Sequence, residues 1–157
     1  VLHLLSLFKP KLILEIGMYL GGTMELWSKA FQPEVLIGVD IAQKSPKVIE
    51  IVKPNYHYLW NMNSTNLATV GKVKEILGDR KVDFLFIDGD HHKLVVESDW
   101  QLFSPLVRQG GVIGFHDVCY QGPEEEVYLF WPQMKKLFPY IELKSLTAST
   151  GWGLVFV

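Results

Sequence analysis

The glycine-rich stretch near the start of the chain constrains the fold more than any other part of the sequence. An apolar run of strand length contains Glu15 and ends at Gly17. Gly21 and Gly22 follow, and a helical pattern then covers residues 23–31. A strand, a glycine-rich turn and a helix in this order are typical of nucleotide-binding loops in α/β proteins. We expect Gly17 to leave room for a ligand, and Gly21 and Gly22 to permit a tight turn and close backbone approach.

The spacing of this stretch separates it from the dinucleotide-binding motif. The chain has Glu-x-Gly-x-x-x-Gly-Gly, whereas the dinucleotide motif is Gly-x-Gly-x-x-Gly. Glu15 is expected at the carboxyl end of its strand, where open parallel sheets bind ligands, so it is placed to meet a cationic or hydroxyl-bearing group. The alternative is that Glu15 only caps a turn and the glycines only shape a connection.

A second acid follows the next predicted strand. Residues 35–39 read as a buried strand, and Asp40 comes directly after them. An acid at the end of the second strand, about 20 residues past the glycine loop, is placed to hold the ribose hydroxyls of an adenosine cofactor. Otherwise Asp40 would be an ordinary strand-end residue that caps the next helix. The combination with Glu15 and the glycines favours the ribose interpretation.

The rest of the pattern alternates strands with helices, as in an α/β sheet. Further strands are expected over residues 56–60, 82–87, 112–115, 140–146 and 152–157, and helices over residues 1–8, 46–53, 65–77 and 93–106. The last two strands are joined around residues 148–151, which predicts a hairpin. At 157 residues we expect a single domain over residues 1–157.

Composition and charge exclude several classes of function. The hydrophobic content of 48% argues against disorder, and no apolar run reaches the roughly 18 residues that a membrane helix needs. The net charge is −2 and the basic residues are scattered, so neither nucleic acid nor membrane is an expected partner. Cys119 is the only cysteine, which excludes an intrachain disulfide framework. No signal peptide opens the chain, and we expect a cytoplasmic location.

A second polar cluster is predicted at the ends of two later strands. Asp88 follows the strand over residues 82–87, and His116 and Asp117 follow the strand over residues 112–115. One strand–helix–strand crossover separates them, so we expect the three side chains to converge at one edge of the sheet. Carboxylate oxygen and imidazole nitrogen suit the same borderline divalent metals. The sequence therefore predicts a metal site of Asp88, His116 and Asp117.

Together the two motifs resemble the class I S-adenosylmethionine-dependent methyltransferases. The later one reads Phe-Ile-Asp-Gly-Asp-His, then a helix, then Ser-Pro-Leu-Val-Arg-x-Gly-Gly-Val-Ile-x-Phe-His-Asp. It looks like the branch that includes cephalosporin hydroxylase-like proteins and metal-dependent sugar or macrolide O-methyltransferases. The resemblance covers residues 11 to about 118. It implies a three-layer, Rossmann-like α/β fold whose seven-stranded mixed sheet has the order 3-2-1-4-5-7-6 with one antiparallel strand.

The resemblance also implies S-adenosyl-L-methionine as the cofactor. In the family the acid of the first motif serves the methionine end, the glycines bracket the cofactor backbone, and the acid after strand two holds the ribose. Where relatives often place an Asp beside a small polar residue at the adenine, this chain has Asn63 and Ser64. Asn63 is expected to meet the adenine through its amide, and Ser64 either joins it or caps the following helix. The cofactor residues implied are Glu15, Gly17, Gly21, Gly22, Asp40, Asn63, Ser64 and Asp88.

In metal-dependent relatives the residues matching Asp88, His116 and Asp117 bind Mg²⁺. His116 stands where relatives often have Glu or Asp, which moves the expected ion from Mg²⁺ toward Mn²⁺, Fe²⁺, Co²⁺ or Zn²⁺, or toward no tightly held ion. His91 stands where several relatives have their general base. A neighbouring cation and the N-terminus of the next helix are both expected to keep the His91 imidazole neutral.

The remaining polar residues of this region receive structural interpretations. Asp90 is expected to cap the helix over residues 93–106, His92 to be a solvated first-turn residue, and Asp99 to lie on the surface or in helix packing. The acids at residues 124–126 suit the positive end of a following helix dipole.

The sequence thus predicts methyl transfer from S-adenosyl-L-methionine to a hydroxyl of a small, sugar-like or natural-product acceptor, with help from a divalent cation, Mg²⁺ or Mn²⁺. A homo-oligomer is compatible with this interpretation. One alternative is a nicotinamide-dependent oxidoreductase, which the acid after strand two favours and the glycine spacing and terminal hairpin disfavour. A second is a non-catalytic domain that binds an adenosyl ligand.

Overall fold

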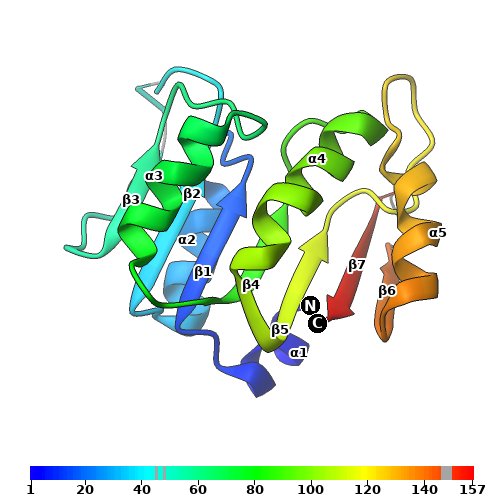
Figure 1. The fold of residues 1–157 in the computed structure, drawn as a ribbon, viewed down its shortest axis with the longest axis horizontal. Coiled ribbons are helices and arrows are strands. Elements are labelled where there is room, and N and C mark those ends of the chain that lie inside the picture. Colours follow the sequence, from blue (N-terminus) through cyan, green and yellow to red (C-terminus); the bar gives the residue numbers. More distant parts are fainter. Residues whose placement is uncertain (45, 48, 146–149) are drawn as a thin grey trace.

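In the computed structural model, a mixed β-sheet is covered by helices on both faces (Figure 1). The structure describes residues 1–44, 46–47, 49–145 and 150–157. The strands are β1 (Leu12–Ile16), β2 (Val35–Val39), β3 (Tyr56–Leu59), β4 (Val82–Ile87), β5 (Val107–Phe115), β6 (Tyr140–Lys144) and β7 (Gly151–Phe156). The helices are α1 (Leu2–Phe8), α2 (Gly22–Phe31), α3 (Leu67–Leu77), α4 (Lys93–Phe103), which a 3₁₀ turn over Ser104–Leu106 follows, and α5 (Val127–Leu137).

The described strands form one seven-stranded sheet in the order β3-β2-β1-β4-β5-β7-β6. This is the order that the resemblance implied. β7 pairs antiparallel with both β5 and β6, and the other neighbours pair parallel. The carboxyl ends of β1, β2, β4 and β5 therefore meet at one edge of the sheet, where the loops that follow them lie side by side.

Strand residues alternate between two hydrophobic cores because successive side chains of a strand point to opposite faces. In β4, Leu85 and Ile87 belong to the core under α3, α4 and α5, which lie in front of the sheet in Figure 1. Phe84 and Phe86 belong to the core on the other face, where α2 lies. There the Trp27 ring meets these two phenylalanine rings edge-on, with centroids 5.4 and 5.6 Å away. Both faces of the central strands are therefore buried, and no helix in the described residues is long and apolar enough to cross a membrane.

Glu15 is a charged-type residue buried within the second core. Its side chain is fully buried in β1, where Oε2 accepts a hydrogen bond from Trp27 Nε1 (2.7 Å) and Oε1 accepts one from the Thr23 hydroxyl. Burial raises the pKa of Glu15 to about 8, although the two hydrogen bonds oppose the rise. Glu15 is therefore mostly protonated at neutral pH, and it ties α2 to β1 directly beneath the glycine-rich turn.

The helix expected over residues 46–53 does not form in the described part of that segment. The backbone N–H of Ile49 donates to the Leu20 carbonyl (2.9 Å), and that of Ile51 donates to the Tyr58 hydroxyl (2.9 Å). Because these two amides bond to groups outside the segment, they make no helical hydrogen bonds, and the backbone of residues 49–53 is irregular.

Two smaller expectations also need correction, and a third falls outside the described residues. The strand expected over residues 112–115 begins earlier, at Val107, so the glycine pair at residues 110–111 lies inside β5, with Gly110 at φ 71°. Ser64 does not cap α3, because the Asn66 side chain accepts from the Ala68 N–H and fills that role. Most of the predicted hairpin turn at residues 148–151, and the predicted end of strand six at residue 146, lie outside the described residues.

We predict that Glu15 makes the stability of the protein depend on pH. Because the folded-state pKa is raised, the stabilisation is fully present below the unfolded pKa of 4.5 and is lost as pH rises through about 8. Glu15→Gln keeps a donor and an acceptor for Thr23 and Trp27 but cannot ionise. In urea unfolding at a series of pH values, the wild type should lose stability relative to Glu15→Gln by up to roughly 1.4 kcal/mol per pH unit. Parallel curves for the two proteins would show that Glu15 ionises normally.

Candidate functional site

A pocket of about 430 Å³ opens at the carboxyl ends of the central strands. Gly17 and Asp40 line it from the ends of β1 and β2, Asn63 and Ser64 from the loop after β3, and Asp88 from the end of β4. All five were expected to hold a cofactor. Apolar side chains also line the wall, namely Ile16, Val39, Ile41, Met62 and Val95. A mainly apolar cavity with a few convergent polar groups is the usual form of a small-molecule site.

Three of the expected cofactor residues do not line this pocket. Glu15 is buried between β1 and α2, with both carboxyl oxygens hydrogen-bonded inside the protein. Gly21 lies at the N-cap of α2 with φ 79°, and a Cβ there would come within 2.3 Å of the Ile49 carbonyl oxygen. Gly22 has open space around the position of a Cβ. Packing therefore requires glycine at position 21, whereas no steric contact requires it at position 22.

Gly17 is required for a different reason from the one expected. Its φ is 91°, and a Cβ would lie 2.0 Å from the Asp88 carbonyl oxygen and 2.6 Å from the Gly89 Cα. The crowding that excludes a side chain thus comes from the backbone at the end of β4, and not from a ligand. Gly17 lets the loops after β1 and β4 lie against each other.

Asp40 organises the glycine-rich loop from the end of β2. Its Oδ2 accepts hydrogen bonds from the backbone N–H groups of Met18 (2.9 Å) and Tyr19 (2.7 Å), and its Oδ1 accepts one from Ala42 N–H (2.7 Å). These bonds hold Tyr19 in a left-handed conformation at φ 49°. A carboxylate oxygen accepts about two hydrogen bonds, so Oδ1 keeps capacity for a ligand hydroxyl.

The loop after β3 presents amide and hydroxyl groups to the pocket. Asn63 Oδ1 accepts from both the backbone N–H and the hydroxyl of Thr65, each at 2.9 Å. The side-chain carbonyl therefore serves the loop, which leaves the NH₂ of Asn63 as the group that faces a ligand acceptor. Ser64 adds its hydroxyl to the same wall.

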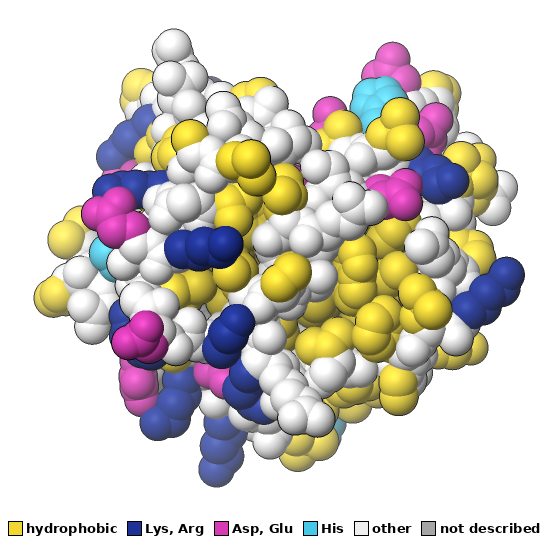
Figure 2. Space-filling view, in the orientation of Figure 1, with side chains coloured by type: hydrophobic (Ala, Val, Ile, Leu, Met, Phe, Trp, Pro, Cys, Tyr) yellow, Lys and Arg dark blue, Asp and Glu magenta, His cyan; other side chains and the backbone are white. Residues whose placement is uncertain are grey.

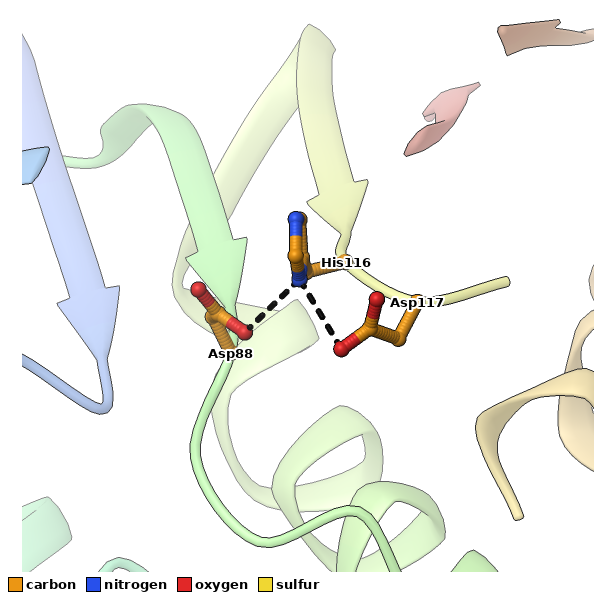
Figure 3. A group of neighbouring side chains, drawn as sticks. All are labelled: Asp88, His116 and Asp117. Atoms are coloured by element: carbon orange, nitrogen blue, oxygen red, sulfur yellow. Dashed lines mark ion pairs between the residues drawn. The ribbon is translucent and has the colours of Figure 1, made fainter. Parts of the chain in front are cut away.

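Asp88, His116 and Asp117 converge as the sequence predicted (Figure 3). His116 Nδ1 lies 3.4 Å from Asp88 Oδ1 and 3.1 Å from Asp117 Oδ2, and the ligand atoms of the three all lie within 4.8 Å of one another. Asp117 is only 7% exposed, and among the described residues its Oδ1 has no hydrogen-bond partner. A buried, unpaired carboxylate oxygen is costly unless a cation satisfies it. This donor set therefore fits a divalent cation.

His91 lies against the same cluster, two residues before α4. Its Nε2 is 3.5 Å from Asp88 Oδ1, and its Nδ1 contacts Glu125 Oε2 closely and Asp117 Oδ2 at 3.6 Å. Hydrogen bonding to Asp88, reinforced by Glu125 and opposed by burial, raises the pKa of His91 to about 9. In the protein without a cation the surrounding carboxylates favour the imidazolium. The neutral imidazole was expected beside a bound cation, and it stays a prediction for that state.

Sequence reasoning missed the part that the acids before α5 play in this site. Glu126 Oε2 accepts from the Lys93 N–H (2.9 Å) and so caps α4, while Glu125 reaches His91. Figure 2 shows acidic and histidine side chains gathered at this edge, between the start of α4 and the loop that leads into α5. The run of three acids is visible in the sequence, but which of them reaches His91 or the start of α4 depends on the path of the loop.

Three neighbouring expectations have mixed outcomes. Asp90 does not occupy the N-cap of α4, which is His92; Asp90 Oδ1 accepts from the His92 backbone N–H (2.8 Å) instead. The His92 side chain is half-exposed, as expected. Asp99 is fully buried in α4, and burial raises its pKa to about 6. It therefore belongs to the packed face of the helix and not to the surface.

Comparison with known sequences finds a family and a distant relative. The sequence profile of a family described as "Methyltransferase domain" matches residues 14–118. Uncharacterized protein R132 of Acanthamoeba polyphaga mimivirus is 31% identical over 109 residues, which cover 66% of this chain and 49% of that protein. The chain thus spans about half the length of this curated relative.

Three solved structures share the fold, each at 18% sequence identity. Cofactor-bound Rv0187 from MTB has a TM-score of 0.68, and its alignment covers 99% of this chain and 77% of the Rv0187 chain. The O-methyltransferase from Bacillus cereus in complex with SAH has a TM-score of 0.66, with 99% and 78% covered. The MycE methyltransferase of the mycinamycin biosynthetic pathway, in complex with Mg, SAH and mycinamycin VI, has a TM-score of 0.65, with 96% and 48% covered.

We predict opposite effects for two glycine substitutions in the same loop. Gly17→Ala forces a residue with a side chain into a positive φ and into the Asp88 backbone, so it should destabilise the protein by about 2 kcal/mol or more. Gly22→Ala meets nothing within 4 Å at the start of α2, so it should leave stability unchanged or raise it by up to about 1 kcal/mol. Denaturant unfolding of both variants checks this, and equal losses would contradict the packing at Gly17.

Proposed function

The chain belongs to the methyltransferase-domain family, and from this premise we propose that it is a class I S-adenosylmethionine-dependent methyltransferase that methylates a hydroxyl of a small acceptor with the help of a divalent cation. One observation carries the proposal: Asp88 both lines the pocket of about 430 Å³ and belongs to the cluster with His116 and Asp117. A methyl donor in that pocket would lie beside the groups that activate the acceptor. The family match sets aside the oxidoreductase alternative.

In this proposal the pocket residues hold S-adenosylmethionine. Asp40 Oδ1 accepts from a ribose hydroxyl, the amide of Asn63 and the hydroxyl of Ser64 bond the adenine edge, and Ile41 and Val95 cover its faces. Support comes from their common lining of one pocket. Glu15 acts at a distance, because it anchors α2 and so the loop that Asp40 organises.

Asp88, His116 and Asp117 would hold the divalent cation, which supplies the Lewis acidity that lowers the pKa of an acceptor hydroxyl. Two carboxylates and one imidazole suit Mn²⁺ as well as Mg²⁺, and the imidazole shifts preference toward the later transition metals. The unpaired Oδ1 of buried Asp117 supports a cation here.

His91 takes the proton from the acceptor hydroxyl in this proposal. As the hydroxyl oxygen bonds the methyl carbon, the methyl–sulfur bond breaks, the sulfonium becomes a neutral thioether, and the released proton moves to Nε2 of His91. Nε2 is the nitrogen that faces Asp88, at 3.5 Å from its Oδ1. Positive charge held between Asp88 and Asp117 would offset the carboxylates that raise the His91 pKa in the metal-free protein.

The acceptor is proposed to be a small hydroxylated molecule of the sugar or natural-product type. A shallow cavity of about 260 Å³ opens beside His91 and Glu125, next to the cofactor pocket, and offers room for it. The MycE structure, which shares this fold, contains Mg, SAH and a mycinamycin. Cys119 is the only cysteine, in keeping with the proposed cytoplasmic location.

Cofactor identity is tested by calorimetric titration. S-adenosylhomocysteine should bind, and NAD should not. Asp40→Ala removes the ribose acceptor and the loop hydrogen bonds, so it should weaken the binding of S-adenosylhomocysteine by about 1–3 kcal/mol. Asp79→Ala, at an acid that does not line the pocket, is the control and should bind like the wild type. Binding of NAD in preference to S-adenosylhomocysteine would overturn the proposal.

Cation binding is tested by titrating the protein with Mn²⁺ and monitoring the titration by electron paramagnetic resonance. The wild type should bind Mn²⁺, and Asp117→Asn and His116→Ala should each weaken binding at least about tenfold, because each removes one ligand. His57→Ala removes an imidazole outside the cluster and should change nothing. Unaltered Mn²⁺ binding in His116→Ala would show that His116 is not a ligand.

A further inference from the structure

Two carboxylates, those of Glu125 and Asp88, lie on opposite sides of the His91 ring. Glu125 Oε2, from the loop between β5 and α5, bonds Nδ1, whereas Asp88 Oδ1 lies 3.5 Å from Nε2. The Glu125 side chain is 22% exposed and that of His91 24%, so the contact is partly shielded from water. The two ring nitrogens therefore have different partners.

The unequal closeness of these two carboxylates decides which nitrogen carries the proton of a neutral imidazole. Glu125 makes a close hydrogen bond to Nδ1, whereas Asp88 is 3.5 Å from Nε2, so the proton stays on Nδ1 and the lone pair on Nε2. The nitrogen that is able to accept a proton then faces Asp88, and Asp88 lines the cofactor pocket. The opposite tautomer would turn the lone pair away from the pocket.

Other groups around the ring do not replace Glu125. Asp117 Oδ2 is 3.6 Å from Nδ1 of His91, beyond hydrogen-bond distance, and it lies closer to His116 Nδ1, at 3.1 Å. Among the described residues, the carboxylates that face the His91 ring are those of Asp88, Asp117 and Glu125. Glu125 alone of these three makes a hydrogen bond to Nδ1.

The backbone brings Glu125 to this position. The N–H of the next residue, Glu126, donates to the His91 carbonyl (2.8 Å), and the Glu126 carboxylate accepts from Lys93 N–H at the start of α4 (2.9 Å). The N–H of Glu125 itself donates to the Gly122 carbonyl (3.2 Å). The loop is thus attached to the same short segment that carries His91, and its contact with the ring follows from that attachment.

We propose that Glu125 is a positioning residue that fixes the His91 ring with the proton on Nδ1 and Nε2 directed toward the acceptor. This inference rests on the proposed function, in which His91 takes the acceptor proton. Glu125 does not touch the reacting atoms; it orients the imidazole as a buried carboxylate does in other carboxylate–histidine pairs.

The test is nuclear magnetic resonance of metal-free protein labelled with ¹⁵N-histidine, recorded at a pH where His91 is neutral. His91→Ala identifies the signals of the ring. In the wild type, the ¹⁵N chemical shift of Nδ1 should be that of a protonated ring nitrogen and the shift of Nε2 that of an unprotonated one. Glu125→Ala should move both shifts toward those of the Nε2–H tautomer, whereas Glu125→Gln should restore the wild-type shifts in part, because an amide oxygen also accepts from Nδ1–H.

The matched control is Glu97→Gln, which removes an acid of α4 that makes no contact with His91 in the described structure. It should leave the His91 signals unchanged. If Glu125→Ala keeps the Nδ1–H tautomer, or if Glu97→Gln changes the tautomer as much as Glu125→Ala does, the positioning role is wrong. The tautomer is measured without cofactor, cation or acceptor, so it does not depend on ligand binding. A protein that binds neither S-adenosylhomocysteine nor Mn²⁺ would overturn the proposed function, whereas an unchanged tautomer in Glu125→Ala would overturn only the role of Glu125.

Discussion

The close approach of two backbones, at Gly17 after β1 and at Asp88 after β4, is the contact on which the site depends. Asp88 N–H donates to the Ile16 carbonyl (2.8 Å), and its own carbonyl oxygen occupies the space that a side chain at position 17 would need. Because the two strand ends touch, the glycine-rich loop and the acidic strand end form one wall. The cofactor pocket and the cation cluster thereby share Asp88.

Glu15 and Asp40 both shape the protein itself. Glu15 is buried, burial raises its pKa to about 8, and it joins β1 to α2 through Thr23 and Trp27. Asp40 accepts three backbone amides and retains one free acceptor position. The loop therefore reaches its shape without cofactor, which lowers the entropy lost when a cofactor binds.

The sheet order followed from the resemblance to the methyltransferases. Most strand bounds and the convergence of Asp88, His116 and Asp117 could be predicted from the residues themselves, because apolar runs mark buried strands and parallel strand ends share an edge. The face that a residue occupies in such a run could not, since strands buried on both sides lack polar alternation, and so the burial of Glu15 was missed. The irregular backbone over residues 49–53 and the reach of Glu125 to His91 both depend on partners distant in sequence. Local patterns carry no signal for such contacts.

The central claim is that a methyl donor and a divalent cation lie side by side at this sheet edge. Paramagnetic relaxation tests it most directly: Mn²⁺ is added to the protein with S-adenosylmethionine, and broadening of the methyl proton resonance of the bound cofactor is measured. The account predicts strong broadening that Asp117→Asn removes while the cofactor stays bound. A methyl resonance that stays sharp although both Mn²⁺ and the cofactor are bound would contradict it.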